Sequence, residues 1–176
     1  MTVSELSELI LGRIRDIPDY PQPGILFKDI TPLLADAEAF KAVVDELALV
    51  HAAGADKIVG IEARGFILAA PVAYRAGAGF VPMRKKGKLP AETLEETYDL
   101  EYGSATIEMH RDALSPGDRV LIVDDVLATG GTARAAVELV RRAGAEVAGI
   151  SVLMELSFLS GRDRLDGVEP RALVTV

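Results

Sequence analysis

The sequence contains no cysteine and no tryptophan, and its only histidines are His51 and His110. The lack of cysteine excludes a disulfide scaffold and a thiolate zinc site, and two histidines argue against an imidazole metal cluster. No apolar run is long enough to cross a bilayer, and the first residues, Met-Thr-Val-Ser-Glu-Leu, lack the basic start and apolar centre of a signal peptide. These absences predict a soluble protein of the cytoplasm.

Positive charge is also scarce. The formal net charge is −8, and no basic helix or polybasic tail is present, so we expect neither a nucleic-acid partner nor a membrane surface. The sequence has no Gly-x-x-x-x-Gly-Lys-Ser/Thr and no Gly-x-Gly-x-x-Gly, which argues against a P-loop nucleotidase and a dinucleotide-binding enzyme. Its 176 residues, 49% of them hydrophobic, predict one domain over residues 1–176 with a substantial core.

The most informative stretch is residues 120–132, Val-Leu-Ile-Val-Asp-Asp-Val-Leu-Ala-Thr-Gly-Gly-Thr. Its first four residues are a β-branched and aliphatic run, typical of a strand buried on both faces. Two aspartates and a glycine turn follow. Residues 133–143 then have the apolar spacing of a helix, which Gly144 ends. The stretch therefore predicts a strand, an acidic pair, a glycine turn and a helix in succession.

The glycine turn has the chemistry of a phosphate site. Gly130 and Gly131 can adopt backbone angles closed to other residues, so that consecutive N–H groups converge on one anion. Thr129 and Thr132 add hydroxyl donors, and the positive end of the helix dipole points to the same place. Taken alone, this tetrapeptide could also be a plain strand-to-helix turn, because such glycine turns are common in α/β folds.

The acidic pair limits the class of ligand that can bind at this turn. Two carboxylates beside a phosphate would repel it unless a neutral or cationic group lay between them. Asp124 and Asp125 can accept hydrogen bonds from ribose hydroxyls, and a magnesium ion carried by the ligand could share the charge. The pattern therefore implies a ribose 5-phosphate.

A second strand-turn-helix joint lies upstream. Residues 57–61 have the pattern of a buried strand, Glu-Ala-Arg-Gly-Phe follows, and a helix is expected to about residue 76. The turn indicates a second anion site at the same edge of the sheet, although Arg64 could also be an ordinary solvated loop residue. The alternation of strands and helices predicts an α/β fold, a mostly parallel twisted sheet flanked by helices, with the site along the carboxyl ends of its strands.

Other segments give simpler predictions. Ser4 is expected to cap a first helix, and residues 36–53 to form an amphipathic helix with His51 as a charge near its C-terminus. We expect a buried strand over residues 147–154 and an edge strand over residues 172–176.

A polar region separates the two joints. Residues 84–88, Arg-Lys-Lys-Gly-Lys, have four cations in five positions, which usually indicates a solvated loop. In an acidic chain such a cluster would also steer an anionic substrate. Residues 91–103 are too polar for a core, so the region from about 84 to 104 is predicted to be a mobile loop. Residues 105–110 alternate as a half-exposed strand, which makes His110 a surface side chain.

Several motifs together resemble one family. Residues 120–132 resemble the phosphoribosyl-diphosphate (PRPP) binding motif of the type I phosphoribosyltransferases. The adenine-specific branch of this family is indicated by four further segments: residues 25–32, 62–66, 101–103 and 155–162. The resemblance covers nearly the whole chain.

In this branch the first residues, about 1–35 here, form a helix and a hood over the purine. The resemblance implies that Leu26, Phe27 and Lys28 line the base pocket, with Leu127 against the other side of the ring. From the residues alone, the apolar run before Lys28 is also typical of a core strand. Lys28 departs from the family pattern, where arginine is frequent, and lysine lacks the planar fork of arginine.

The resemblance further implies the reaction of adenine with PRPP to give AMP and pyrophosphate, a step of purine salvage. It implies Mg²⁺ bound mainly through substrate oxygens and water, with no direct protein ligand, and a homodimer. A purine phosphoribosyltransferase for hypoxanthine, guanine or xanthine shares the central motif. A PRPP- or purine-sensing regulator without chemistry is a further alternative, but it would need a nucleic-acid surface that this acidic chain lacks.

Residue roles follow from the same resemblance. The leaving pyrophosphate is assigned to Ala63 and Arg64 with Lys85 or Lys88, and the sugar hydroxyls to the two aspartates. Glu101 is the candidate for proton transfer at the purine ring, and Tyr102 is expected to pack over the closed site. The 5-phosphate is assigned to the segment Ala128, Thr129, Gly130, Gly131 and Thr132.

Overall fold

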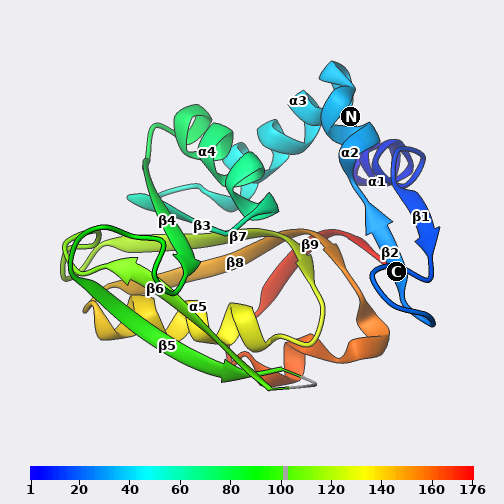
Figure 1. Cartoon of the computed structure of the whole chain (residues 1–176). Coiled ribbons are helices and arrows are strands. Elements are labelled where there is room, and N and C mark those ends of the chain that lie inside the picture. Colours follow the sequence, from blue (N-terminus) through cyan, green and yellow to red (C-terminus); the bar gives the residue numbers. More distant parts are fainter. Residues whose placement is uncertain (101–102) are drawn as a thin grey trace.

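The computed structural model describes residues 1–100 and 103–176, which form an α/β sandwich (Figure 1). Within these residues the main sheet has seven strands in the order β5-β6-β4-β3-β7-β8-β9. Strands β4, β3, β7, β8 and β9 are parallel, whereas β6 is antiparallel to both β4 and β5. Their bounds are β3 Lys57–Ile61, β4 Gly79–Lys85, β5 Thr93–Asp99, β6 Ser104–His110, β7 Arg119–Leu127, β8 Glu146–Glu155 and β9 Pro170–Thr175.

Helices cover both faces of the sheet (Figure 1). One layer contains α1 Val3–Leu11, α2 Thr31–Ala35, α3 Ala37–Glu46, the π-helical turn η1 Leu47–His51 and α4 Arg64–Ala76. The other contains α5 Gly131–Arg142, followed after β8 by the 3₁₀ turns η2 Ser157–Leu159 and η3 Gly161–Arg164. Successive residues of a strand point to opposite faces, so Leu121 belongs to the core under α4 and Ile122 to the core under α5. The predicted fold is confirmed.

The central strand is longer than predicted. β7 continues through both aspartates to Leu127 before the glycine turn begins, because its pairing with β8 extends to Leu127 opposite Glu155. Both aspartates therefore lie within the last paired residues of β7 and not beyond the strand. Strand geometry fixes the direction of both side chains.

The N-terminal hood is a separate two-stranded hairpin of β1 Arg15–Pro18 and β2 Leu26–Asp29. Leu26 is 50% exposed, so this segment is not a core strand. Helix α1 is capped by Thr2, not by Ser4 as predicted. The Thr2 hydroxyl accepts from the Glu5 N–H, and the Glu5 carboxylate accepts from the Thr2 N–H, which completes a capping box.

The polar region before β6 is more regular than predicted. Strand β5 occupies Thr93–Asp99 and pairs with β6 over its whole length. The region was predicted to be a mobile loop, and this part of it is a strand, because polar side chains are readily accommodated on an exposed hairpin. We call β5 and β6 the hairpin arm. Its mobility stays a prediction, and Glu101 and Tyr102 lie outside the described residues.

His51 differs from the prediction of a helix-end charge. Its ring is half-buried, and Nδ1 lies 2.7 Å from the hydroxyl oxygen of the buried Ser151. Burial, and next the charge of Arg171, lower the pKa of His51. The imidazole is therefore a half-buried group whose surroundings favour its neutral form. Among the described residues, no helix is both long and apolar enough to span a membrane.

Candidate active site

The carboxyl ends of β3 and β7 lie side by side, because Gly60 pairs with Val123 in the parallel ladder. The segments that follow each strand therefore meet at one edge of the sheet. Between them is a cavity of about 310 Å³. Six of its lining residues are among the predicted site residues, namely Ala63, Arg64, Lys85, Asp124, Asp125 and Thr132.

The acidic pair has unused hydrogen-bonding capacity. Asp125 is 6% exposed, and its Oδ2 lies 2.8 Å from Arg64 Nε. The N–H of Arg64 is not directed at this oxygen, which accepts no hydrogen bond within the part of the chain that the structure describes. A buried carboxylate oxygen without a donor is costly unless a ligand supplies one. This oxygen therefore suits a hydroxyl group bound in the cavity.

Asp124 is electrostatically different from its neighbour. Its Oδ1 accepts from the Asp125 N–H at 2.8 Å. Burial, and next the charge of Asp125, raise the pKa of Asp124 well above its ordinary value, against the opposite effect of Arg64. Simultaneous ionisation of both acids is therefore disfavoured in the empty site.

Helix α4 approaches this pair closely, and Gly65 permits the approach. A Cβ atom on Gly65 would lie 2.8 Å from Asp124 Oδ1 and 3.1 Å from the Val123 carbonyl oxygen. Such contacts are too short for any other residue. The first turn of α4 is thus packed on the acids and places Arg64 beside them.

Arg64 also connects the hood to the site. Its Nη1 donates to the Lys28 carbonyl oxygen at 3.3 Å, and its guanidinium lies 4.9 Å from the centre of the Phe27 ring. Arg64 is therefore not an ordinary solvated side chain. The Lys28 ammonium pairs with Asp16 at 2.7 Å within the hood hairpin, and it is the main-chain carbonyl of Lys28 that accepts from Arg64.

The glycine turn at the end of β7 has a backbone that only glycine adopts easily. Gly130 has a φ of 82° in the left-handed region. A Cβ atom there would clash with the Gly161 carbonyl oxygen, and one on Gly161 would clash with the Ala128 carbonyl oxygen. The turn is therefore pressed onto η3, and it ends in the first residues of α5, whose N–H groups have no partner within the helix.

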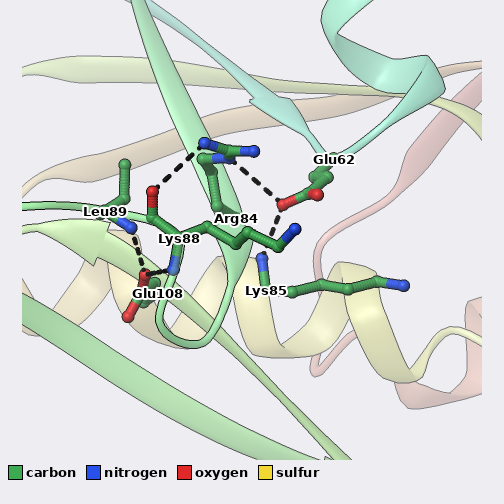
Figure 2. A network of polar contacts seen from close by, with 6 residues as sticks. All are labelled: Glu62, Arg84, Lys85, Lys88, Leu89 and Glu108. Carbon is green, nitrogen blue, oxygen red and sulfur yellow. Dashed lines mark hydrogen bonds and ion pairs between the residues drawn. The ribbon is translucent and has the colours of Figure 1, made fainter.

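A basic turn at residues 84–88 closes one side of the cavity, and two carboxylates hold it (Figure 2). Glu62 Oε2 accepts from the Lys85 N–H at 2.9 Å and from Arg84 Nε at 3.3 Å. Burial alone would raise the pKa of Glu62, but the Lys85 N–H and the Arg84 guanidinium outweigh it and lower this pKa. The carboxylate is thus ionised and fixes the start of the turn.

The second carboxylate fixes the end of the same turn. Glu108 is buried, and its Oε1 accepts from the Lys88 and Leu89 N–H groups at 2.9 and 2.8 Å. Burial again opposes ionisation, but N–H groups of this turn lower the pKa of Glu108 below its ordinary value. The Lys88 side chain extends toward Glu62 in Figure 2, and Lys85 lines the cavity.

Comparison with known proteins identifies the family. A family model described as "Phosphoribosyl transferase domain" matches residues 33–171. The chain is 65% identical over 174 residues to adenine phosphoribosyltransferase of Thermobifida fusca, covering 98% of this chain and 99% of that relative. It is also 65% identical to the enzyme of Streptomyces coelicolor, with 97% of both chains covered. The chain belongs to the adenine phosphoribosyltransferase family.

Solved structures of the family agree with this membership. Adenine phosphoribosyltransferase from Rhodothermus marinus has a TM-score of 0.93 at 51% identity, covering 98% of this chain and 99% of that one. The Saccharomyces cerevisiae enzyme, complexed with an imino-altritol bisphosphate and adenine, has a TM-score of 0.93 at 38% identity, covering 97% and 99%. The chain is therefore a pentosyltransferase that acts on adenine, as the sequence predicted.

Not every residue that the family motifs single out reaches the cavity. Leu127 is buried in the core under α5 and lines a small cavity of about 80 Å³ beneath the glycine turn. Leu26 lies exposed on the hood. The base pocket expected from the family thus stays a prediction, whereas the acidic pair, Arg64 and the glycine turn are brought together.

Tyr98 is a residue of this cavity that no sequence motif singled out. It lies on the hairpin arm, and its hydroxyl oxygen lies 3.1 Å from Thr132 Oγ1. Alternation of Leu94, Glu96 and Tyr98 along the polar stretch is the signal that could have revealed a strand with one face turned inward. The same alternation explains why this arm is not a featureless loop.

Proposed function

We propose that this cavity transfers the 5-phosphoribosyl group of PRPP to adenine and releases AMP and pyrophosphate, a step of purine salvage. The observation that carries the proposal is the meeting of three parts around one cavity: the glycine turn, the acidic pair and Arg64. No single part would specify the substrate, because each also occurs in unrelated α/β proteins.

The ribose 5-phosphate half is bound by the end of β7 and the start of α5. N–H groups of Ala128 to Thr132, with the two threonine hydroxyls, hold the 5-phosphate at the positive end of the helix dipole. Asp124 and Asp125 accept the sugar hydroxyls. The unmatched Oδ2 of Asp125 supports this role, since a hydroxyl donor would satisfy it.

The purine is held under the hood. Phe27 offers an apolar face beside Arg64, and Leu26 and Leu127 are proposed to complete the pocket for the flat ring. The Lys28 ammonium is ion-paired with Asp16. Lys28 therefore contributes to the purine pocket through its main chain unless that ion pair opens.

The chemistry is a substitution at the anomeric carbon. The C–O bond to pyrophosphate breaks as N9 of adenine forms the new C–N bond, so positive charge builds on the sugar. Ala63, Arg64 and Lys85 or Lys88 hold the departing pyrophosphate, which neutralises its developing charge. The site must keep both partners aligned and exclude water.

Two residues of the arm tip complete the proposal. Glu101 exchanges a proton with the purine ring as N9 forms its bond to the anomeric carbon, and Tyr102 packs over the closed site. Both assignments rest on the family resemblance of residues 101–103.

Mg²⁺ fits this arrangement as an ion that accompanies the substrate. The proposal places the ion on substrate oxygens and water, and among the described residues no group of three or more His, Cys, Asp or Glu side chains could hold a metal. Asp124 and Asp125 would face the ion through the sugar hydroxyls and water. When bound, Mg²⁺ supplies charge neutralisation for the pyrophosphate group.

A homodimer is part of the proposal. Helix α4 presents Ile67 and Tyr74 to solvent, Tyr74 with 90% of its surface exposed, and β4 adds Phe80. Exposed apolar side chains on two neighbouring elements favour a surface that a partner covers. A second copy of this chain is the proposed occupant.

The experiment is a parallel assay with one PRPP concentration and four bases. Formation of AMP from adenine is expected to exceed formation of IMP, GMP and XMP from hypoxanthine, guanine and xanthine by orders of magnitude. Preference for another base would replace adenine as the substrate. Lack of any nucleotide product with measurable PRPP binding would instead favour a sensor.

A further inference from the structure

The hairpin arm is fastened along α5, the helix whose N-terminus forms the glycine turn. Arg142, at the far end of this helix, donates to the Glu95 carbonyl oxygen at 2.6 Å and pairs with the Glu96 carboxylate at 2.9 Å. Leu94 and Tyr98 pack against the core on the α5 side of the sheet. Figure 1 shows β5 running alongside α5. The inward face of β5 therefore ends over the first turn of α5.

Tyr98 is the residue at that end. A Cβ atom on Gly131 would lie 3.1 Å from Tyr98 Cδ2, so the ring covers the position that a side chain would take. The Tyr98 hydroxyl meets Thr132 Oγ1 at 3.1 Å. The ring also borders two spaces, the cavity of about 310 Å³ with the acids and a groove of about 690 Å³ beside Arg134 and Arg164. The Tyr98 ring therefore lines both the cavity and the groove.

We infer that Tyr98 is a positioning residue for the 5-phosphate of the substrate. Its ring forms a roof over Gly131, and its hydroxyl orients the Thr132 hydroxyl toward the anion. The inference rests on the proposed function, which places the phosphate at residues 128–132.

The hydroxyl pair has the chemistry that this role needs. Each hydroxyl has one donor and two acceptor lone pairs. In the empty site Thr132 donates to the Tyr98 oxygen. With a phosphate in the turn, Thr132 donates to the phosphate while the Tyr98 hydroxyl donates to Thr132 Oγ1. No donor is lost in this exchange, and the tyrosine polarises the threonine O–H that contacts the charge.

A purely structural role for Tyr98 predicts a different result. If the residue only packs the arm onto α5, Tyr98→Phe keeps the ring and should leave ligand affinity unchanged. If the hydroxyl orients Thr132, the same change weakens every ligand with a 5-phosphate by about 2- to 12-fold, the worth of one hydrogen bond. Adenine alone, which has no phosphate, should bind unchanged.

The arm offers a matched control. The hydroxyls of Thr97 on β5 and Thr106 on β6 lie 2.8 Å apart. Thr97 neighbours Tyr98 on the same strand and points to the opposite face. Thr97→Val therefore removes a comparable hydroxyl pair from the arm while the pair at the glycine turn stays in place.

The test is calorimetry of AMP and adenine binding, with steady-state kinetics on the same proteins. For Tyr98→Phe we expect AMP affinity to fall and the KM for PRPP to rise by about 2- to 12-fold, with kcat at saturation and the KM for adenine kept. Thr97→Val should match the original chain. In Thr132→Val the further change Tyr98→Phe should have no additional effect on AMP affinity, because the two hydroxyls act as a pair.

Three results would overturn the inference: original AMP affinity in Tyr98→Phe, an equal loss in Thr97→Val, or additive losses in the double variant. Failure of the proposed function is a separate outcome. In that case the original chain would not bind AMP at the glycine turn, and Gly131→Val would leave any AMP affinity intact.

Discussion

At the scale of single residues, the main feature of the site is how burial makes chemically equal groups different. Burial, and next the charge of Asp125, raise the pKa of Asp124, whereas Asp125 Oδ2 lies 2.8 Å from Arg64 Nε. The two neighbouring acids therefore have different surroundings, which their positions in the sequence do not indicate.

His51 gives a residue-scale prediction on pH. Burial and Arg171 lower its pKa in the folded chain, so below about pH 6.5, its value in an unfolded chain, the unfolded state binds more protons. Stability is then lost as the pH falls from about 6.5 toward the folded pKa, and it is fully present above that range. The thermal midpoint should fall more between pH 8 and pH 5.5 in the original chain than in His51→Gln.

The control for this experiment is His110→Gln. This histidine ends β6 of the hairpin arm, so the variant removes an imidazole and leaves the half-buried His51 in place. Each 1 kcal/mol of stability corresponds to about 2–4 °C in a domain of this size. Equal slopes for the original chain and His51→Gln would contradict the prediction.

Glu101 gives a second residue-scale prediction. If it manages a proton on the purine ring, Glu101→Gln should lower kcat by about 10²- to 10⁴-fold and leave AMP affinity near that of the original chain. Glu92→Gln is the matched control, because Glu92 lies in the same region with its side chain 89% exposed. Undiminished turnover at saturating adenine and PRPP would remove Glu101 from the chemistry.

At the scale of elements, the site is made of strand ends and helix starts whose directions the fold sets. The N-terminus of α5 and the first turn of α4 both face the edge where β3 and β7 end. A parallel sheet brings such joints together because every crossover helix begins at the same edge. The hairpin arm adds an antiparallel pair of strands that brings Tyr98 to the cavity at this edge.

The glycine turn gives an element-scale prediction. Gly131→Val should abolish PRPP binding, with a loss of more than about 100-fold, because its side chain blocks the approach of phosphate to the N–H groups and displaces Tyr98. Gly149→Ala in β8 is the control, since a Cβ atom there makes only an ordinary 3.6 Å contact with Leu121. Normal PRPP affinity of Gly131→Val by calorimetry would refute the phosphate assignment.

At the scale of the whole molecule, α4 and β4 leave apolar side chains exposed, among them Ile67, Tyr74 and Phe80. Sedimentation of the chain should therefore give the mass of a homodimer, and Tyr74→Glu should shift it toward the monomer by placing a charge in the interface. Glu138→Gln on α5, on the opposite face of the sheet, should leave the dimer intact. A monomer at micromolar concentration in the original chain would contradict the prediction.

The local pattern of residues was sufficient to predict many of the helices and strands of this protein and the order of the residues around its glycine turn. The strand, acidic pair, glycine turn and helix of residues 120–132 are consecutive, so their order and chemistry can be read directly from neighbouring residues. Periodicity likewise predicted α4, α5 and the buried parallel strands, because side-chain direction repeats with fixed periods in helices and strands. The family motifs added the activity, which the relatives confirm.

Only the tertiary structure decided which distant side chains meet. Thr132 and Tyr98 are 34 residues apart, and His51 and Ser151 are 100 apart. Their contacts follow from the strand order β5-β6-β4-β3-β7-β8-β9, and strand order depends on the packing of the whole core, not on local preference. For this reason the sequence by itself determined the glycine turn and the acids before it, whereas folding decided that Tyr98 covers the turn and that His51 is half-buried against Ser151.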